Sequence, residues 1–321
     1  VLQVKPVGEG HFVGEPGPGS HRIYGGLTIC QALDAARRCC PAELSIQSMH
    51  GQFLRPGDHQ HAIDITVETL KDGRRFKLYN VYCRQQGKLI FFASVTLHQP
   101  EDAYQHFLAP PQRQLPEADT AQFFPHRQQF WSEQEAQGRS WAFEVRIEEP
   151  LDFHRRQAPV NQTWFRAVDA EGLSGWQQIL LLAYASDWNM PSVAMRPHTV
   201  AEGSLPQLAS LDHVIWFYRP PRLQQWLTYV QESPAAWHGR GHTRGLFYDQ
   251  QGALLAAGKP MTVAQLGNVF EEPERPDSNA IREALQEIEA RCEDRGFELK
   301  EVSSGFRFQV RQNLSPWISR L

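Results

Sequence analysis

The 321-residue chain lacks any run of about 18 apolar residues, which argues against a membrane-spanning helix. It also lacks the apolar core of a secretory signal peptide, and because it starts at Val1 rather than at methionine, we expect the natural N-terminus to lie upstream. Cysteine is scarce and shows no Cys-x-x-Cys spacing, the five residues being Cys30, Cys39, Cys40, Cys83 and Cys292. This usage argues against a disulfide framework or a zinc site and favours a reducing, cytoplasmic location.

An excess of either charge is missing as well. The formal net charge is −4, with 21% charged and 41% hydrophobic residues, which is ordinary for globular proteins. Such a balance argues against a nucleic acid as the partner. No Gly-x-Ser-x-Gly motif is present, which argues against the nucleophile elbow of a serine hydrolase. The length predicts about two domains.

The chain contains an internal repeat. Residues 50–97 open with a histidine, continue through Phe-Leu-Arg-Pro and end on Gln-Gln-Gly and apolar residues. Residues 213–255 show the same order, with Phe217, Arg219 and Pro220 in the places of Phe53, Arg55 and Pro56. Such self-similarity predicts two copies of one supersecondary unit.

Each copy is preceded by a predicted helix. Residues 27–40 carry apolar side chains at helical spacing before Pro41, and residues 175–187 are apolar on all sides, which predicts a buried helix. Strands are predicted after the second helix, over 208–218, 226–232 and 242–248. A buried helix wrapped by an antiparallel sheet, made twice, is the double-hotdog arrangement.

Several motifs give the chain a family resemblance. Over about residues 10–252 it resembles the type II acyl-CoA thioesterases, and the matching motifs are Tyr24-Gly25-Gly26, Gln31-Ala32-Leu33, Phe53-Leu54-Arg55-Pro56-Gly57-Asp58, Val67 to Gly73, Tyr184-Ala185-Ser186-Asp187, Leu211-Asp212-His213, Trp216-Phe217 and Glu232-Ser233. The resemblance implies a double hotdog, an acyl-CoA substrate, and neither a metal nor an organic cofactor. It also implies that a carboxylate, a hydroxyl and a glutamine hold the attacking water.

The resemblance assigns the carboxylate to Asp187 and the hydroxyl to Ser210, and it places His50, Gly25 and Gly26 near the substrate. Asp187 also stands out physically, because a carboxylate is unfavourable at the C-terminal end of a helix unless another group stabilises it. If 208–218 is a strand, Ser210 and Asp212 face the same side. A structural role for His50 and a helix-ending role for Asp187 are the alternatives. Arg240 and Arg244 are candidate partners for CoA phosphates, with solvated surface arginines as the alternative.

The match breaks after Gly252. The glutamine that the resemblance implies falls on Pro260, which has no N–H to donate to a central strand. From about residue 252 the chain is similar to segregation and condensation protein B, a winged-helix condensin subunit, through Ala253 to Val263, Phe270-Glu271-Glu272, Ile281 to Leu285, Phe297 to Val302, Phe306-Arg307-Phe308 and Pro316-Trp317. A helix capped by Ser278 and a β-hairpin around residues 303–305 are expected there.

We therefore expect an α+β chain with a first hotdog (1–103), a connection (104–140), a second hotdog with an incomplete closing strand (141–252) and a winged-helix-like segment (253–321). The leading hypothesis is acyl-CoA hydrolysis, slowed by loss of the glutamine. The alternatives are a non-hydrolysing acyl-CoA binder and a chromosome-segregation module whose partner is a condensin kleisin subunit. A homo-oligomer, the origin of the join, and the choice between strand and helix for 253–262 stay open.

Overall fold

The computed structural model describes residues 2–17, 22–102, 104–111, 114–115, 142–149, 151–152, 154–168, 170–199 and 208–258, and the backbone of 297–302 and 305–310. The chain divides into two compact units. The first comprises residues 1–234 and 241–260, and the second comprises 235–240 and 261–321.

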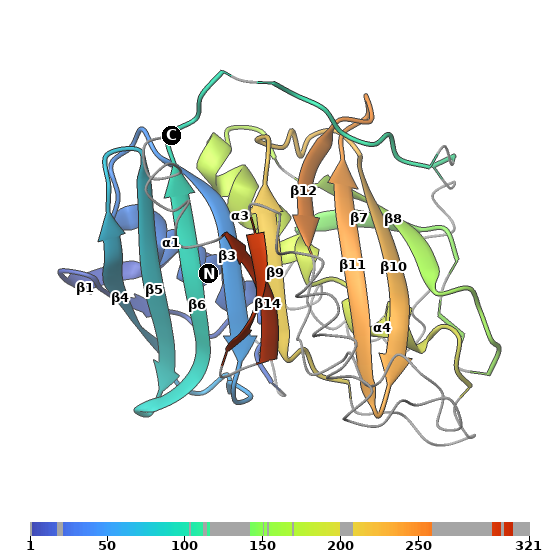
Figure 1. Cartoon of the computed structure of the whole chain (residues 1–321), viewed down its shortest axis with the longest axis horizontal. Helices are drawn as coiled ribbons and strands as arrows, with labels where there is room; N and C mark the ends of the chain where they lie inside the picture. The colour runs from blue at the N-terminus through green and yellow to red at the C-terminus, as the bar shows by residue number, and fades with distance from the viewer. Residues whose placement is uncertain are drawn as a thin grey trace. The chain divides into compact units, whose positions relative to one another are not determined.

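The first unit is built on one twelve-stranded sheet (Figure 1), whose two halves repeat the same order of elements. The first half contains β1 (Lys5–Gly8), β2 (His11–Gly14), helix α1 (Gly25–Arg38), β3 (Ser45–Phe53), β4 (Ile63–Asp72), β5 (Phe76–Gln85) and β6 (Lys88–His98). The second half contains β7 (Phe143–Ile147), β8 (Val160–Ala167), helices α3 (Gly175–Ser186) and α4 (Met190–Met195), β9 (Asp212–Phe217), β10 (Leu227–Trp237), β11 (Arg240–Tyr248) and β12 (Leu254–Gly258).

The order across the sheet is symmetric about its centre. From the centre outward it runs β3-β6-β5-β4-β2-β1 on one side and β9-β12-β11-β10-β8-β7 on the other. Each strand of the second half thus takes the place of one in the first, with β9 matching β3 and β12 matching β6. The prediction of two helix-and-sheet units from the internal repeat is confirmed.

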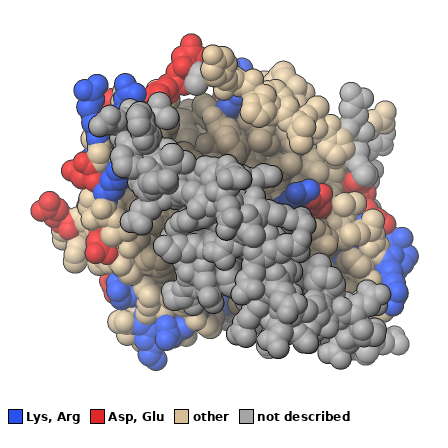
Figure 2. Space-filling view, viewed as in Figure 1, with Lys and Arg blue, Asp and Glu red and all other residues tan. Residues whose placement is uncertain are grey.

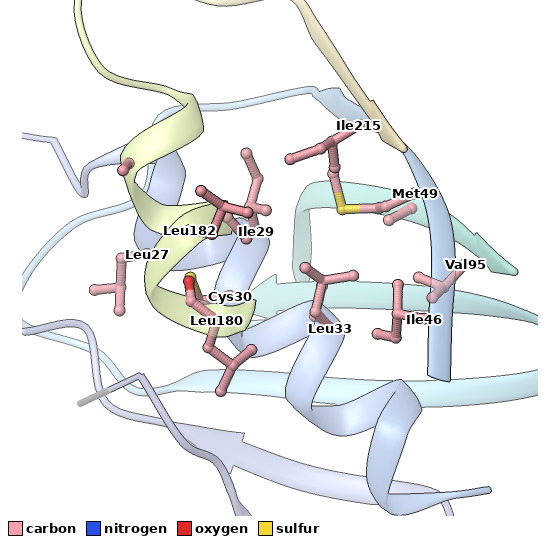
Figure 3. Packing of buried hydrophobic residues seen from close by; sticks show 14 of the residues in the cluster. Leu27, Ile29, Cys30, Leu33, Ile46, Met49, Val95, Leu180, Leu182 and Ile215 are labelled. Atoms are coloured by element: carbon pink, nitrogen blue, oxygen red, sulfur yellow. The ribbon is translucent and has the colours of Figure 1, made fainter. Parts of the chain in front are cut away.

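Helices α1 and α3 supply much of the core. Figure 3 shows Ile29 and Leu33 of α1 and Leu182 of α3 meeting Met49 of β3 and Ile215 of β9, and all five are fully buried. The predicted helix over 27–40 begins two residues earlier and ends two residues earlier, while the helix predicted over 175–187 ends at Ser186. The apolar spacing of both segments explains why these faces are buried.

The two halves meet where β3 and β9 pair antiparallel, with Gly51 opposite His213 and His50 opposite Val214. Side chains alternate along a strand, so one pair faces the helices and the next faces away. Met49, His213 and Ile215 are buried on the helix side, whereas His50 is exposed. This register decides which histidine approaches the helix ends.

Residues 254–258, which the sequence left open between strand and helix, form β12. The strand pairs with β9 through Gly258 and Ile215 and with β11 through Gly258 and Gly245. It therefore extends the second half of the sheet past residue 252, the boundary expected from sequence. Pro260 lies outside the described residues, two positions after β12 ends.

In the second unit, β13 (Phe297–Val302) and β14 (Gly305–Val310) pair antiparallel, with Phe297 opposite Val310. The hairpin predicted around residues 303–305 is confirmed. The helix expected after Ser278 lies outside the described residues, so the winged-helix arrangement stays a prediction.

Candidate active site

Asp187 lies at the C-cap of α3, directly beside the first turn of α1. Its Oδ2 accepts a hydrogen bond of 3.1 Å from the backbone N–H of Gly26. The N-cap residue of α1, Tyr24, provides no side-chain acceptor for that turn. A carboxylate that is disfavoured by the negative end of its own helix is thus stabilised by the positive end of another.

Two glycines at the start of α1 make this approach sterically feasible. A Cβ at Gly25 would lie 2.7 Å from Oδ2 of Asp187 and 2.9 Å from the ring of Phe53, and one at Gly26 would lie 2.6 Å from the carbonyl oxygen of Tyr184. Neither position has room for a larger residue without movement. The structure therefore places Gly25 and Gly26, expected near the substrate, against the candidate carboxylate.

Burial dominates the electrostatics of Asp187, of which 8% is exposed. Loss of hydration raises the pKa of Asp187 to about 7, and the Gly26 amide and the Ser210 hydroxyl oppose that rise only in part. A carboxyl with a pKa near neutrality can take up and release a proton at physiological pH.

Ser210 reaches Asp187 from the chain before β9. Its Oγ lies 3.5 Å from Oδ1 of Asp187, at the outer limit for a hydrogen bond. The predicted strand over 208–218 is shorter in the structure, since β9 begins only at Asp212. The prediction of a strand at Ser210 was wrong, so strand alternation does not relate the direction of Ser210 to that of Asp212.

A residue not selected from the sequence, His213, completes the cluster. It is 4% exposed, and its Nδ1 lies 3.9 Å from Oδ1 of Asp187. Burial lowers the pKa of His213 to about 4, so the ring is neutral at physiological pH. The sequence did carry a signal for it, because His213 precedes Phe217 by four residues, an even number that puts both on the same face of the strand.

His50 does not join this cluster. It stands on the opposite face of the sheet from His213, where its ring contacts that of Trp216 with centroids 5.6 Å apart. His50 precedes Phe53 by three residues, an odd number, so the two point to opposite sides. The structure thus separates His50 from Asp187 and Ser210, with which the sequence had grouped it.

Neither arginine expected to meet CoA phosphates faces the cluster. Arg244 forms an ion pair with Glu232 and is exposed, whereas the neighbouring Thr243 is buried and donates to the carbonyl oxygen of Met190 in α4. Arg240, four residues before Arg244 on β11, shares its face by strand alternation. Their role in CoA binding stays a prediction.

Of the helices α1 and α3, only α1 has a carboxylate hydrogen-bonded to its first turn among the described residues. At α3 the hydroxyl of Ser174 accepts from the backbone N–H of Gln177 at 3.2 Å, which forms a local capping box. The other buried carboxylate on a helix, Asp34 of α1, is saturated by the backbone N–H of Val4, the indole N–H of Trp176 and the side chain of Arg38. The repeat therefore presents one candidate site in its described part.

Other site classes find no support in the described residues. No group of three His, Cys, Asp or Glu side chains there has metal-binding geometry, and no described helix is both long and apolar enough to cross a membrane. On the face shown in Figure 2, basic and acidic side chains both lie among the described residues, and neither sign covers the face alone. The cluster around Asp187 remains the best candidate for chemistry.

Comparisons with known proteins identify families and relatives that are similar to this chain. Residues 132–268 match the family profile "Acyl-CoA thioesterase", and residues 14–98 match the profile of the acyl-CoA thioesterase N-terminal domain. The chain is 33% identical to acyl-CoA thioesterase 2 of Haemophilus influenzae, covering 74% of this chain and 86% of that protein. It is 30% identical to human acyl-coenzyme A thioesterase 8, covering 87% and 90% respectively.

Solved structures agree with the fold. The acyl-CoA thioesterase II TesB2 of Mycobacterium marinum aligns with a TM-score of 0.64 at 30% identity, over 80% of this chain and 92% of that one. A hot dog fold protein of Alicyclobacillus acidocaldarius aligns with a TM-score of 0.63 at 19% identity, over 80% of this chain and 93% of that one, which supports the fold alone.

The C-terminal part of the chain matches a second protein family. Residues 250–321 match the profile of the segregation and condensation complex subunit ScpB. A stretch of 71 residues is 38% identical to the segregation and condensation protein B homolog of Coxiella burnetii and covers 34% of that protein. Residues 250–268 are thus matched by two unrelated families, and within them 254–258 pair in the sheet of the first unit.

Proposed function

Because this chain belongs to the acyl-CoA thioesterase family, we propose that it hydrolyses acyl-CoA thioesters, with Asp187 as the general base. One observation carries the assignment of the base. The buried carboxylate of Asp187 is held between the first turn of α1 and the hydroxyl of Ser210.

The proposed reaction begins with a water molecule held by Asp187 and Ser210. The water oxygen attacks the thioester carbonyl carbon while its proton passes to the carboxylate of Asp187. The tetrahedral intermediate then collapses, the C–S bond breaks, and the proton held by Asp187 goes to the departing CoA thiolate. The products are a fatty acid and CoA, and Asp187 is again ionised.

The start of α1 supports the oxyanion of that intermediate. Amide groups in the first turn of a helix carry a partial positive charge, and although Asp187 accepts the Gly26 N–H, the N-cap residue Tyr24 adds no side-chain cap to that turn. A thioester carbonyl placed beside Gly25 and Gly26 would direct its developing negative charge at this turn. Loss of one oxyanion donor costs about 10²–10³ in rate in other hydrolases.

The rate is proposed to be low, because Pro260 stands where the resemblance implies a glutamine. Proline has no side-chain amide to orient water. β12 pairs with both β9 and β11 up to Gly258, which supports a second half of the sheet that includes its closing strand. We therefore expect the chain to lack the glutamine side chain but not the whole closing strand.

A thiol-release assay with medium- and long-chain acyl-CoA substrates tests the proposal. We expect slow hydrolysis by the full chain and a rate about 10–100 times higher for Pro260→Gln. Absence of thiol release from both proteins, with acyl-CoA still bound, would favour the alternative of a non-hydrolysing acyl-CoA binder. Absence of binding as well would overturn the assignment.

A second function is proposed for the tail, because residues 250–321 match a condensin subunit. Its partner would be a condensin kleisin subunit, and the site of action would be the cytoplasm, in keeping with the free thiols of Cys30, Cys39, Cys40 and Cys83. Pull-down of a kleisin by the full chain, compared with the chain ending at Gly258, tests this role. Equal capture by both would remove the tail as the binding element.

A further inference from the structure

A chain of buried hydrogen bonds fixes the tautomer of His213. The hydroxyl of Ser186 lies 2.6 Å from the carbonyl oxygen of Ala183, and since a carbonyl cannot donate, the hydroxyl must. The same Oγ lies 3.0 Å from Nε2 of His213. Having used its only proton on Ala183, Ser186 can only accept, so the hydrogen of the neutral ring is on Nε2.

It follows that Nδ1 of His213 carries a lone pair, and this lone pair is on the side of Asp187, 3.9 Å from Oδ1. An ionised carboxylate offers no proton to share with Nδ1, which accounts for a separation longer than a hydrogen bond. A protonated carboxyl would supply that proton, and a movement of about 1 Å would bring the atoms into hydrogen-bond range.

We propose that His213 is a positioning residue that accepts a hydrogen bond from Asp187 while Asp187 holds the proton taken from the attacking water. The inference rests on the proposed function in making Asp187 the general base. His213 takes no proton itself. Its neutral Nδ1 stabilises the protonated carboxyl and holds the proton on Oδ1 until the CoA thiolate receives it.

Among the described residues, the other ionisable groups packed around the pair do not titrate in the working range. Tyr24 at the N-cap of α1, Cys30 of α1, Tyr184 of α3 and Tyr229 of β10 lie around it, and burial raises the pKa of each well beyond its ordinary value. The Tyr229 hydroxyl also donates to the carbonyl oxygen of Ser186 at 2.7 Å, which holds the end of α3 in place. Proton exchange in this cluster between neutral and mildly alkaline pH therefore concerns Asp187.

The first test needs no turnover. The full chain is labelled with ¹⁵N-histidine, and the signals of His213 are identified by their loss in His213→Asn. We expect a protonated Nε2 and an unprotonated Nδ1, whose shift moves as pH falls through about 7, in line with protonation of Asp187. In Asp187→Asn the Nδ1 shift should not move over this range. A hydrogen on Nδ1 in the wild-type protein would overturn the proposal.

The second test uses the pH dependence of kcat/KM. Ser186→Ala removes the hydroxyl that accepts from Nε2 and so fixes the tautomer of His213. The alternative tautomer, with the hydrogen on Nδ1, would stabilise the ionised carboxylate of Asp187. The acid limb of the kcat/KM profile should therefore shift about one pH unit lower. Ser94→Ala, on the opposite face of the sheet, is the matched control and should leave the limb in place.

Substitution of the ring separates positioning from packing. His213→Asn keeps an oxygen acceptor near the place of Nδ1 and should retain kcat within about threefold, whereas His213→Leu should lower it about tenfold at unchanged KM. Equal losses in both variants, with no shift of the acid limb in Ser186→Ala, would reduce His213 to a packing role. If the NMR result holds while hydrolysis is absent, the proposed function fails and the hydrogen-bond arrangement stands.

Discussion

The Oδ2 atom of Asp187, at the end of α3, accepts the backbone N–H of Gly26, at the start of α1, across 3.1 Å. The two residues are 161 positions apart in the sequence and belong to different copies of the repeat. This contact makes the end of one helix the cap of the other. It sets a buried carboxylate at the start of α1, whereas the start of α3 is capped by its own Ser174.

The glycine at the start of α1 is therefore expected to matter for activity more than for folding. Gly25→Ala puts a methyl group 2.7 Å from Oδ2 of Asp187, so the carboxylate must move and kcat/KM should fall by more than about tenfold. Gly175→Ala is the matched control, since Gly175 begins α3 and a methyl group there would meet no described atom within 4 Å. Comparable activity in the two variants would show that the approach of Asp187 to α1 is not required.

Ionisation of Asp187 should cost folding stability. The folded carboxyl has a pKa of about 7, above its value in the unfolded chain, so the folded state binds the proton more tightly. Stability from this group is present at low pH and is lost as pH rises toward 7, by as much as about 4 kcal/mol. Asp187→Asn should then be more stable than wild type at pH 8 in urea unfolding, with the difference shrinking toward pH 5. A constant difference across that range would contradict the buried, ionisable state.

The sequence predicted the repeat and both helices, because apolar periodicity and motif order survive without tertiary information, and it also selected Asp187 as the candidate carboxylate. It grouped His50 with Asp187 and Ser210 because the motif match ignored whether the spacing to the phenylalanine is odd or even. His50 and His213 open the two copies, but one residue more separates His213 from its phenylalanine, and that residue puts the two rings on opposite faces.

Ser210 shows the opposite case. It was selected by resemblance and does lie beside Asp187, yet the strand invoked to orient it begins two residues later. Only tertiary contact, in which the chain before β9 passes the end of α3, decides its direction. The tautomer of His213 was equally out of reach, since it depends on which atom the Ser186 hydroxyl contacts.

The join between the two families should leave the tail the less stable part. Residues 254–258 pair with β9 and β11, so they are not available as the beginning of a first helix for the condensin-like segment. Amides of β13 and β14 should exchange with deuterium at least about 100 times faster than those of β9 and β11. Equal protection in the two sets would show that the tail folds fully without those residues.

Turnover by Asp187→Asn tests the central claim most directly. Asparagine keeps the size of the side chain and removes the charge, so it cannot accept the proton of the attacking water. In a thiol-release assay at pH 8, we expect the rate to fall by more than about 100-fold while the circular dichroism spectrum matches that of the wild type. A folded Asp187→Asn that hydrolyses acyl-CoA within about twofold of the wild-type rate would contradict the role of Asp187 as the base.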